Sequence, residues 1–332
     1  MQPAPPSFPH TCTLLVTGAA GFIGSHFVKL ALTAGYRVLC LDNLSRGSSE
    51  TLLGHPYILA DLLHSVSIEA VFQEYPIDAV VHFAAFTDVG ESLACPDLYY
   101  QNNFLSTFSL LETMRRHGVD KFLFSSSAAI FGLPKTPTLR EEHPKNPINP
   151  YGTTKWMCEQ LLQDYYRSYH MSSCSLRYFN AAGGDPSGQI PYRQRRPSNL
   201  IPLALLATKQ RLPLTIFGID YPTKDGTCIR DYIHVEDLAT AHLFALQKLF
   251  GSEKGIWAYN LGNGAGYSVR EVIRTIEETL HTKLLIQEGA RREGDPPQLI
   301  ADASLAKKEL LWSPQYPHLE QMVSHAWQAI HH

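Results

Sequence analysis

Short apolar runs alternate with amphipathic segments through the first half of the chain. The runs are rich in leucine, valine, isoleucine and phenylalanine, which is typical of buried strands, and the segments between them carry apolar residues at helical spacing. The predicted strands cover residues 13–18, 36–42, 56–61, 78–85, 121–127 and 174–180. The predicted helices cover residues 22–35, 67–75 and 98–117, and another begins near residue 151. This alternation predicts a parallel sheet with helices on both faces.

The pattern changes after about residue 181. A segment dense in glycine, proline and arginine covers residues 183–197, and loops of this length in a compact domain are usually functional. Further predicted helices cover residues 198–210, 235–250 and 268–280, predicted strands cover 214–218, 256–262 and 283–288, and predicted loops cover 220–235 and 289–297. We therefore expect an α/β protein with a Rossmann-like, doubly wound parallel sheet in residues 1–180, to which residues 231–262 return, and a smaller C-terminal α/β substrate-binding lobe in residues 181–332.

Composition and charge exclude some classes of partner. The 332 residues are 44% hydrophobic and 18% charged, and the net charge of −3 gives no electrostatic reason to expect nucleic acid or a membrane surface as a partner. No run approaches the ~20 apolar residues of a membrane-spanning helix, and residues 1–11 lack the apolar core of a signal peptide. Six cysteines without metal-like spacing favour a reducing compartment and predict no metal site, so we expect a cytoplasmic protein.

Two basic features are interpreted as solvated loops. The run formed by Arg193, Arg195 and Arg196 is short, and short charge runs usually lie on the surface. Arg46 follows the second predicted strand and is interpreted as a solvated turn residue.

Glycines follow the first predicted strand and open the first predicted helix. Gly18, Gly21 and Gly24 let the backbone turn tightly and approach a pyrophosphate, which the free N–H groups of a helix N-terminus bind. Asp42 ends the second predicted strand, where a carboxylate binds the ribose hydroxyls of adenosine and repels a 2′-phosphate. These residues predict NAD rather than NADP as the cofactor. Asp61 ends the third predicted strand, and it either contacts the adenine edge or only caps the next segment.

A tyrosine and a lysine lie four residues apart near the start of a predicted helix. Tyr151 and Lys155 therefore share one face of that helix. An unperturbed tyrosine has a pKa near ~10, which is too high for a base at neutral pH. We expect the Lys155 ammonium and the positive charge of an oxidised nicotinamide to lower the pKa of Tyr151. Ser127 ends a predicted strand at the sheet edge, where it can orient a substrate hydroxyl. Together the three residues predict an acid/base site.

Around these residues the sequence resembles the extended short-chain dehydrogenase/reductase family, and within it the 4-epimerases that act on UDP-glucose and UDP-galactose. The resemblance runs from about residue 13 to 326 and rests on phrases such as VTGAAGFIGSH, LDNLSRG, SSSAAIFG, NPYGTTK and DYPTKDGTCIRDYIHV. It implies that Tyr151 takes the proton of the sugar 4-hydroxyl while NAD takes the C4 hydride, and that the keto sugar then turns and receives the hydride on its other face. It also implies a homodimer paired through the helices near Leu98 and Tyr151.

The same resemblance implies two sets of contacts. Those to NAD come from Gly18, Gly21, Phe22, Ile23, Gly24, Asp42, Asn43, Asp61, Leu62, Phe83, Ala84, Asn102, Lys155 and Tyr178. Those to the UDP-sugar come from Ser127, Asn180, Asn199, Leu200, Thr215, Phe217, Arg230, Arg292, Asp295 and Leu299. Guanidinium groups suit a diphosphate, and a carboxylate suits ribose hydroxyls.

Three positions depart from the pattern of the resembling enzymes. Ala129 stands where many have threonine, and Thr87 stands where close relatives often have lysine. Leu299 stands where a tyrosine narrows the sugar pocket and a smaller residue opens it for N-acetylated sugars. Leucine is intermediate in size, which predicts some activity on UDP-N-acetylhexosamines.

Other functions compete with this interpretation. A sugar-nucleotide dehydratase needs an added acid and base after the serine, where SSSAAIFG has alanines, and a decarboxylase needs an added cation for the C6 carboxylate. Epimerases of UDP-pentoses or UDP-uronates remain rivals. A non-catalytic NAD-binding sensor is expected to lack the tyrosine or the lysine, and both are present.

Overall fold

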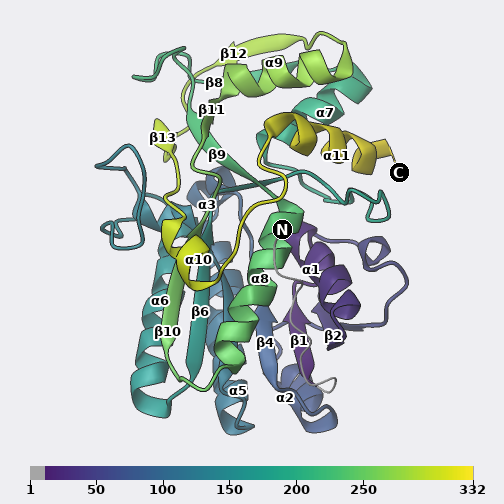
Figure 1. The fold of residues 1–332 in the computed structure, drawn as a ribbon, viewed down its shortest axis with the longest axis vertical. Helices are drawn as coiled ribbons and strands as arrows, with labels where there is room; N and C mark the ends of the chain where they lie inside the picture. Colours follow the sequence, from purple (N-terminus) through teal and green to yellow (C-terminus); the bar gives the residue numbers. More distant parts are fainter. Residues whose placement is uncertain (1–11, 332) are drawn as a thin grey trace.

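The computed structural model describes residues 12–331, and its largest element is a seven-stranded sheet (Figure 1). The strand order is β10-β6-β5-β4-β1-β2-β3, and each neighbouring pair is parallel. The strands are β1 (Thr13–Thr17), β2 (Arg37–Asp42), β3 (Tyr57–Leu59), β4 (Ala79–His82), β5 (Lys121–Ser127), β6 (Ser172–Tyr178) and β10 (Ile256–Leu261). The order reverses between β1 and β4, which makes that edge the ligand-binding switch point of a doubly wound sheet. The predicted Rossmann-like fold is confirmed.

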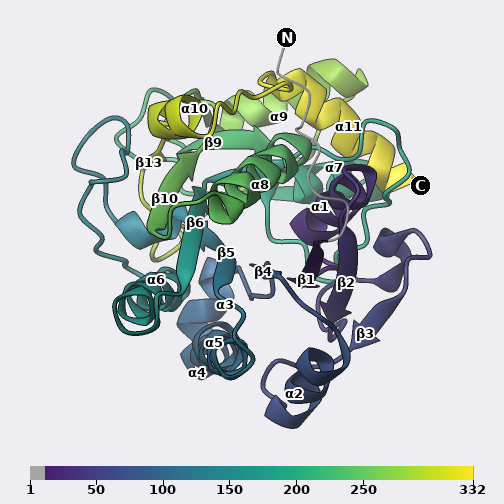
Figure 2. The same cartoon turned by 60° about the horizontal axis from the view of Figure 1, so that its bottom comes forward.

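Helices cover both faces of this sheet (Figure 2). One face carries α1 (Phe22–Thr33) and α8 (Val235–Phe250), and the other carries α2 (Ser65–Glu74), α5 (Ser106–Arg116) and α6 (Pro150–Tyr169). The strand residues alternate between the two cores: Leu14 and Val16 belong to the core that includes Phe27 of α1, whereas Leu15 belongs to the core on the other face. Because both faces of the sheet are buried, its strands appear in the sequence as continuous apolar runs.

The helix expected at residues 98–117 is interrupted in the structure. α4 (Pro96–Tyr99) passes into a π-helical turn, η2 (Tyr100–Leu105), before α5 begins. Within this turn the buried Asn103 side chain accepts a hydrogen bond from Phe86 N at 2.8 Å and donates to Phe86 O at 2.9 Å. The turn therefore fastens the helix to the loop that follows β4, at the switch point of the sheet. Single π turns of this kind are frequent at functional sites.

The smaller lobe is built around β9 (Ile229–His234), at the top of Figure 1. Its partners are β11 (Gly266–Ser268), β13 (Gln298–Leu299) and β7 (Asn180–Ala182), and a separate pair joins β8 (Leu214–Phe217) to β12 (Ile286–Gly289). The helices α7 (Leu200–Gln210), α9 (Val269–Leu280) and α11 (Leu319–His331) pack into one apolar core with these strands. The prediction of a loop through residues 220–235 was wrong for its last third, which forms β9. The strand was missed because the buried Asp231 interrupts its apolar pattern.

Asp231 is stabilised in that strand by backbone donors. Its carboxylate accepts hydrogen bonds from Asn263 N, Gly264 N and Ala301 N at 2.9–3.1 Å. Burial nevertheless raises the pKa of Asp231 to about 6. A charged residue within an apolar run argues against a strand in the sequence. Here the hydrogen bonds from backbone N–H groups distant in the sequence offset the cost of burying the carboxylate.

The second half of the chain also contributes to the large sheet. α8 packs against α1, and β10 pairs with β6 at the sheet edge. α10 (Ser304–Glu309) and α11 were not predicted. The division into lobes at residue 180 stays a prediction, and the signal-peptide interpretation of residues 1–11 lies outside the described residues. Among residues 12–331, the helices are all too short or too polar to cross a membrane.

Candidate active site

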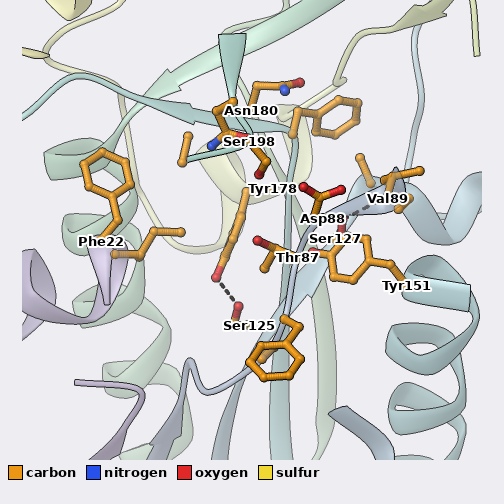
Figure 3. Close-up of a pocket in the computed structure, with 18 of the residues that line it drawn as sticks. Phe22, Thr87, Asp88, Val89, Ser125, Ser127, Tyr151, Tyr178, Asn180 and Ser198 are labelled. Carbon is orange, nitrogen blue, oxygen red and sulfur yellow. Dashed lines mark hydrogen bonds between the residues drawn. The ribbon is translucent and has the colours of Figure 1, made fainter. Parts of the chain in front are cut away.

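Three adjoining cavities share lining residues and form one cleft along the carboxyl edge of the sheet. The central cavity contains Ser127 and Tyr151 and is bordered by the glycine turn (Figure 3). A smaller cavity continues from it toward the end of β2, and a larger one of about 720 Å³ continues into the C-terminal lobe. Cavities of roughly 300–1,000 Å³ are the size of small-molecule sites in proteins. The cleft therefore has room for the ends of two different ligands, one on each side of Tyr151.

The glycine turn has the geometry that a pyrophosphate site requires. Gly18 has a φ of +70°, and a Cβ built on it would lie 2.5 Å from Ala84 N. A Cβ on Gly24 would lie 2.2 Å from Gly18 O. α1 begins after Gly21, and within residues 12–331 no side chain caps it, so its first N–H groups border the central cavity. These residues fit the dinucleotide that the sequence predicts.

Asp42 lies in the smaller cavity, as the adenosine end of a dinucleotide requires. Its Oδ2 accepts a hydrogen bond from Ala20 N at 2.9 Å, and its Oδ1 accepts one from Leu44 N at 2.7 Å. Burial raises the pKa of Asp42, while the two backbone donors oppose that rise. Asp61 lines the same cavity, and its Oδ1 accepts a hydrogen bond from Leu63 N at 2.9 Å within the turn before α2, so it borders the site without capping that helix. The other predicted residues here are Asn43, Leu62, Phe83, Ala84 and Asn102.

The start of α6 brings Tyr151 to the end of β5. Asn149 caps the helix by accepting a hydrogen bond from Gly152 N at 2.9 Å. A Cβ on Gly152 would lie 2.5 Å from Ala129 O, so glycine lets the helix start approach the turn η3 (Ala128–Phe131) closely. Tyr151 and Ser127 consequently line the same cavity, with Phe22 on the opposite side (Figure 3).

The tyrosine is buried, and burial dominates its titration. Desolvation raises the pKa of Tyr151, and a hydrogen bond with Ser127 lowers it by less. The expected lowering of the Tyr151 pKa by Lys155 is therefore wrong for the protein alone. The physical reason is that a phenolate loses more hydration on burial than the nearby groups restore.

Lys155 lies beneath the cavity and is almost fully buried. Its Nζ donates a hydrogen bond to Ser125 O at 2.7 Å and lies 4.8 Å from the centre of the Phe124 ring. Burial lowers the pKa of Lys155 to about 8. Tyr178 borders the cavity from β6, and its hydroxyl donates to Ser125 Oγ (Figure 3). Ser125 thus joins two predicted cofactor residues, and the sequence reasoning did not single it out.

The cavity in the C-terminal lobe collects the remaining predicted residues. Arg230 on β9 lies 3.4 Å from Asp295, and the guanidinium of Arg292 lies 4.0 Å from the centre of the Phe217 ring. These residues line the larger cavity together with Asn180, Asn199, Leu200 and Thr215. Two guanidinium groups and one carboxylate at one end of the cleft suit a nucleoside diphosphate. Leu299 pairs with Arg230 in the sheet and lines the central cavity.

The three departures from the family pattern all face the central cavity. Ala129 and Thr87 line it, as does Leu299. The backbone N–H of Ala129 donates to Ser127 Oγ at 3.1 Å, so this position holds the serine through its main chain. The missing threonine hydroxyl therefore leaves the orientation of Ser127 intact.

The interpretation of Arg46 as a solvated residue was wrong. Its Nη2 lies 2.5 Å from Glu91 Oε2, and its guanidinium lies 4.4 Å from the centre of the Phe86 ring. Within the basic run, Arg193 pairs with Glu50 at 2.7 Å and Arg196 pairs with Glu91 at 3.2 Å, while the Arg195 side chain is exposed as expected. Arg46 follows β2 and Glu91 follows β4, the two strands that flank β1, and this common edge of the sheet is the signal that could have joined Arg46 to Glu91.

This arrangement places the chain among the Rossmann-type enzymes that combine a nicotinamide dinucleotide with a tyrosine acid/base. Comparison with known proteins narrows that class. The chain belongs to the NAD dependent epimerase/dehydratase family, whose model matches residues 14–262.

Individual relatives match nearly the whole chain. A UDP-glucose 4-epimerase of Halalkalibacterium halodurans is 44% identical over 315 residues, covering 95% of this chain and 94% of the relative. The crystal structure of UDP-glucose 4-epimerase from Brucella ovis in complex with NAD has a TM-score of 0.91 at 41% identity, covering 95% and 97% of the two chains. That of the Bifidobacterium longum enzyme in complex with NAD⁺ and UDP has a TM-score of 0.90 at 39% identity, covering 96% and 97%.

Proposed function

We propose that the protein interconverts UDP-glucose and UDP-galactose at C4 as an NAD-dependent 4-epimerase. The observation that carries this proposal is the position of Tyr151 and Ser127 in one cavity between a dinucleotide turn and a diphosphate-binding lobe. The similarity to proteins named UDP-glucose 4-epimerase over nearly the full chain supports it.

The protein's own groups have separate tasks in this reaction. Ser127 holds the sugar 4-hydroxyl, and Tyr151 accepts its proton and later returns it. When bound, NAD accepts the hydride from C4 of the sugar, and its positive charge favours the phenolate of Tyr151. Lys155, whose Nζ donates a hydrogen bond to Ser125 O, binds the nicotinamide ribose.

The two ends of the cleft allow the sugar to turn while the nucleotide stays in place. Arg230 and Asp295, which border both cavities, and Arg292 in the larger cavity hold the uridine diphosphate. Around the hexose, Ala129 and Leu299 present apolar side chains to the central cavity. Apolar walls bind the ring without fixing either face by hydrogen bonds, so the 4-keto sugar can present both faces in turn.

A dehydratase is disfavoured by the residues beside Ser127. Elimination of water needs an added acid and base near the sugar. The turn η3 supplies Ala128 and Ala129 to the cavity at this place, and neither can transfer a proton.

The proposal is tested by turnover of the purified protein. With UDP-glucose we expect UDP-galactose in a coupled assay and a reduced-nicotinamide absorbance band during incubation. A panel with UDP-pentoses and UDP-uronates ranks the rival substrates by kcat/KM. A protein that retains NAD but forms no epimer from any UDP-sugar is a sensor, and this result would overturn the proposal.

Leu299 supports a second candidate activity on N-acetylated sugars. Because leucine leaves more room than tyrosine, we expect measurable conversion of UDP-GlcNAc. Leu299→Tyr is expected to lower the ratio of kcat/KM for UDP-GlcNAc to that for UDP-glucose by about tenfold, since overfilling a pocket costs about 1–3 kcal/mol. Both values come from the same coupled assay. No conversion of UDP-GlcNAc by the unaltered protein would show the prediction wrong.

We also propose a homodimer in a reducing compartment. Tyr100, Leu105 and Phe108 expose large apolar side chains on η2 and α5, and such a patch suits a second copy of the same helices. Phe108→Glu is expected to convert a two-chain mass in light scattering to a one-chain mass, because a buried charge at the interface is costly. A one-chain mass for the unaltered protein would contradict this. The six free cysteines suit a cytoplasmic enzyme.

A further inference from the structure

The central cavity has a feature that the reaction itself does not use: a carboxylate that joins two arginines across its rim. Glu91 lies on α3 (Val89–Ala94), which follows β4. Its carboxylate accepts hydrogen bonds from Arg46 Nη2 at 2.7 Å and 2.5 Å, and from Arg196 Nη1 at 3.2 Å. All three residues line the central cavity.

The two arginines belong to segments far apart in the sequence. Arg46 follows β2 and borders both the glycine turn and the adenosine end of the cleft. Arg196 belongs to the segment 183–197, which has neither helix nor strand and connects β7 to α7 in the smaller lobe. Glu91 therefore joins one wall of the dinucleotide cavity to the segment that crosses its opening.

Glu91 is held rigidly enough to act as an anchor. Its backbone N–H donates to Asp88 Oδ1 at 3.0 Å, and the buried Tyr99 hydroxyl donates to Glu91 Oε2 at 3.0 Å. The hydrogen bond from Arg46 is the main cause that lowers the pKa of Glu91, so the carboxylate is ionised at neutral pH.

The segment 183–197 is attached at several other points. Asp185 pairs with Lys29 on α1 at 2.7 Å, and Arg193 pairs with Glu50 at 2.7 Å. Arg195 N donates to Arg46 O at 3.2 Å. Gln194 and Arg196 border the same cavity as Gly21. These attachments all precede Arg196, and together with its contact to Glu91 they keep residues 193–196 beside the start of α1, where the pyrophosphate of a dinucleotide fits.

We propose that Glu91 is a positioning residue that retains the bound dinucleotide, by fastening residues 193–196 across the cavity opening through Arg46 and Arg196. This inference rests on the NAD binding of the proposed function. Release of the dinucleotide requires the segment to lift, and lifting breaks the Glu91 contacts. Retention is therefore electrostatic in part and falls as salt screens the ion pairs.

The experiment measures dinucleotide release directly. NAD-loaded protein is transferred into buffer with isotopically labelled NAD, and retained unlabelled NAD is quantified over time after separation and denaturation. Glu91→Gln keeps the size of the side chain but removes its charge, and it is expected to speed release by about tenfold, the effect of losing roughly 1.4 kcal/mol of ion-pair attraction. Salt at 0.5 M is expected to speed release from the unaltered protein and to have little effect on the variant.

Matched variants separate retention from general stability. Glu69→Gln removes a carboxylate paired with Arg116 on the surface away from the cleft, and it is expected to leave the release rate unchanged. Arg196→Gln changes an exposed side chain. Its effect on the release rate is expected to be smaller than additive when it is combined with Glu91→Gln, because both variants break the same contact between Arg196 and Glu91.

Specific outcomes overturn the proposal. One such outcome is an equal release rate for Glu91→Gln and the unaltered protein. Fully additive effects of Glu91→Gln and Arg196→Gln, a release rate that does not change with salt, and a purified protein that retains no dinucleotide are the others. Because the readout is bound NAD rather than turnover, a protein that retains NAD but lacks epimerase activity refutes the proposed function and leaves this inference standing.

Discussion

Replacing Tyr151 with phenylalanine is expected to lower epimerase turnover by roughly 10²–10⁴-fold, the usual contribution of a general acid/base. The variant loses only the hydroxyl that faces Ser127, and the ring keeps its edge contact with Tyr99, whose ring centre lies 6.5 Å away. NAD content and melting temperature are therefore expected to stay near those of the unaltered protein. Initial rates with saturating UDP-glucose measure the effect.

Tyr165→Phe is the matched control for that variant. Tyr165 lies on the same helix, is also buried, and donates to Glu112 Oε1 at 2.5 Å, away from the cleft. Loss of the Tyr165 hydroxyl is expected to leave epimerase turnover unchanged. If Tyr151→Phe retained near-normal turnover, Tyr151 could not be the acid/base, and the assignment built on the cavity would be wrong.

Arg177→Ala is expected to lower the free energy of unfolding by about 3–5 kcal/mol, because it leaves a buried carboxylate without its partner. Arg177 on β6 and Glu159 on α6 are both nearly inaccessible, and their side chains join through hydrogen bonds of 2.6–3.2 Å. Ser126 also donates to Glu159, at 2.6 Å. Urea unfolding followed by circular dichroism measures the change.

This ion pair also bears on the active site. Glu159 lies one helical turn after Lys155, while Arg177 precedes Tyr178 and Ser126 precedes Ser127. The pair therefore fixes α6 against the strands that carry the other predicted catalytic and cofactor residues.

The control is an exposed ion pair. Glu278→Ala breaks a pair with Arg274 that is 4.0 Å long and about 70% exposed on both sides, and it is expected to cost less than about 0.5 kcal/mol. A comparably small loss for Arg177→Ala would show that the buried pair does not stabilise the helix against the sheet.

The sequence was most informative where one local rule governed the structure. The apolar runs predicted β5 at its observed bounds and β1, β2 and β10 to within one residue at each end, because strands covered on both faces form continuous apolar runs. The runs for β3, β4 and β6 located the strands but misplaced their ends by up to three residues. The glycine turn was equally clear, since Gly18 has a positive φ and Gly24 approaches Gly18 O within the same short stretch of chain.

Local rules failed where a distant partner decided the outcome. β9 was missed because Asp231 interrupts its apolar pattern, and only donors from residues 263, 264 and 301 make that strand acceptable. The break at η2 was missed because it depends on the Asn103 contact with Phe86. Arg46 was taken for a solvated residue because Glu91 is 45 positions away in the sequence.

By itself, then, the sequence determined the doubly wound sheet, the dinucleotide turn and the serine, tyrosine and lysine of the site, since each follows from periodicity or from motifs at short spacing. Tertiary structure alone decided the direction of the Tyr151 pKa shift, the burial of Lys155 and the joining of Arg46 to Arg196 through Glu91. The physical reason is that desolvation and ion pairing depend on what surrounds a group in space, and the order of residues along a chain does not contain that environment explicitly.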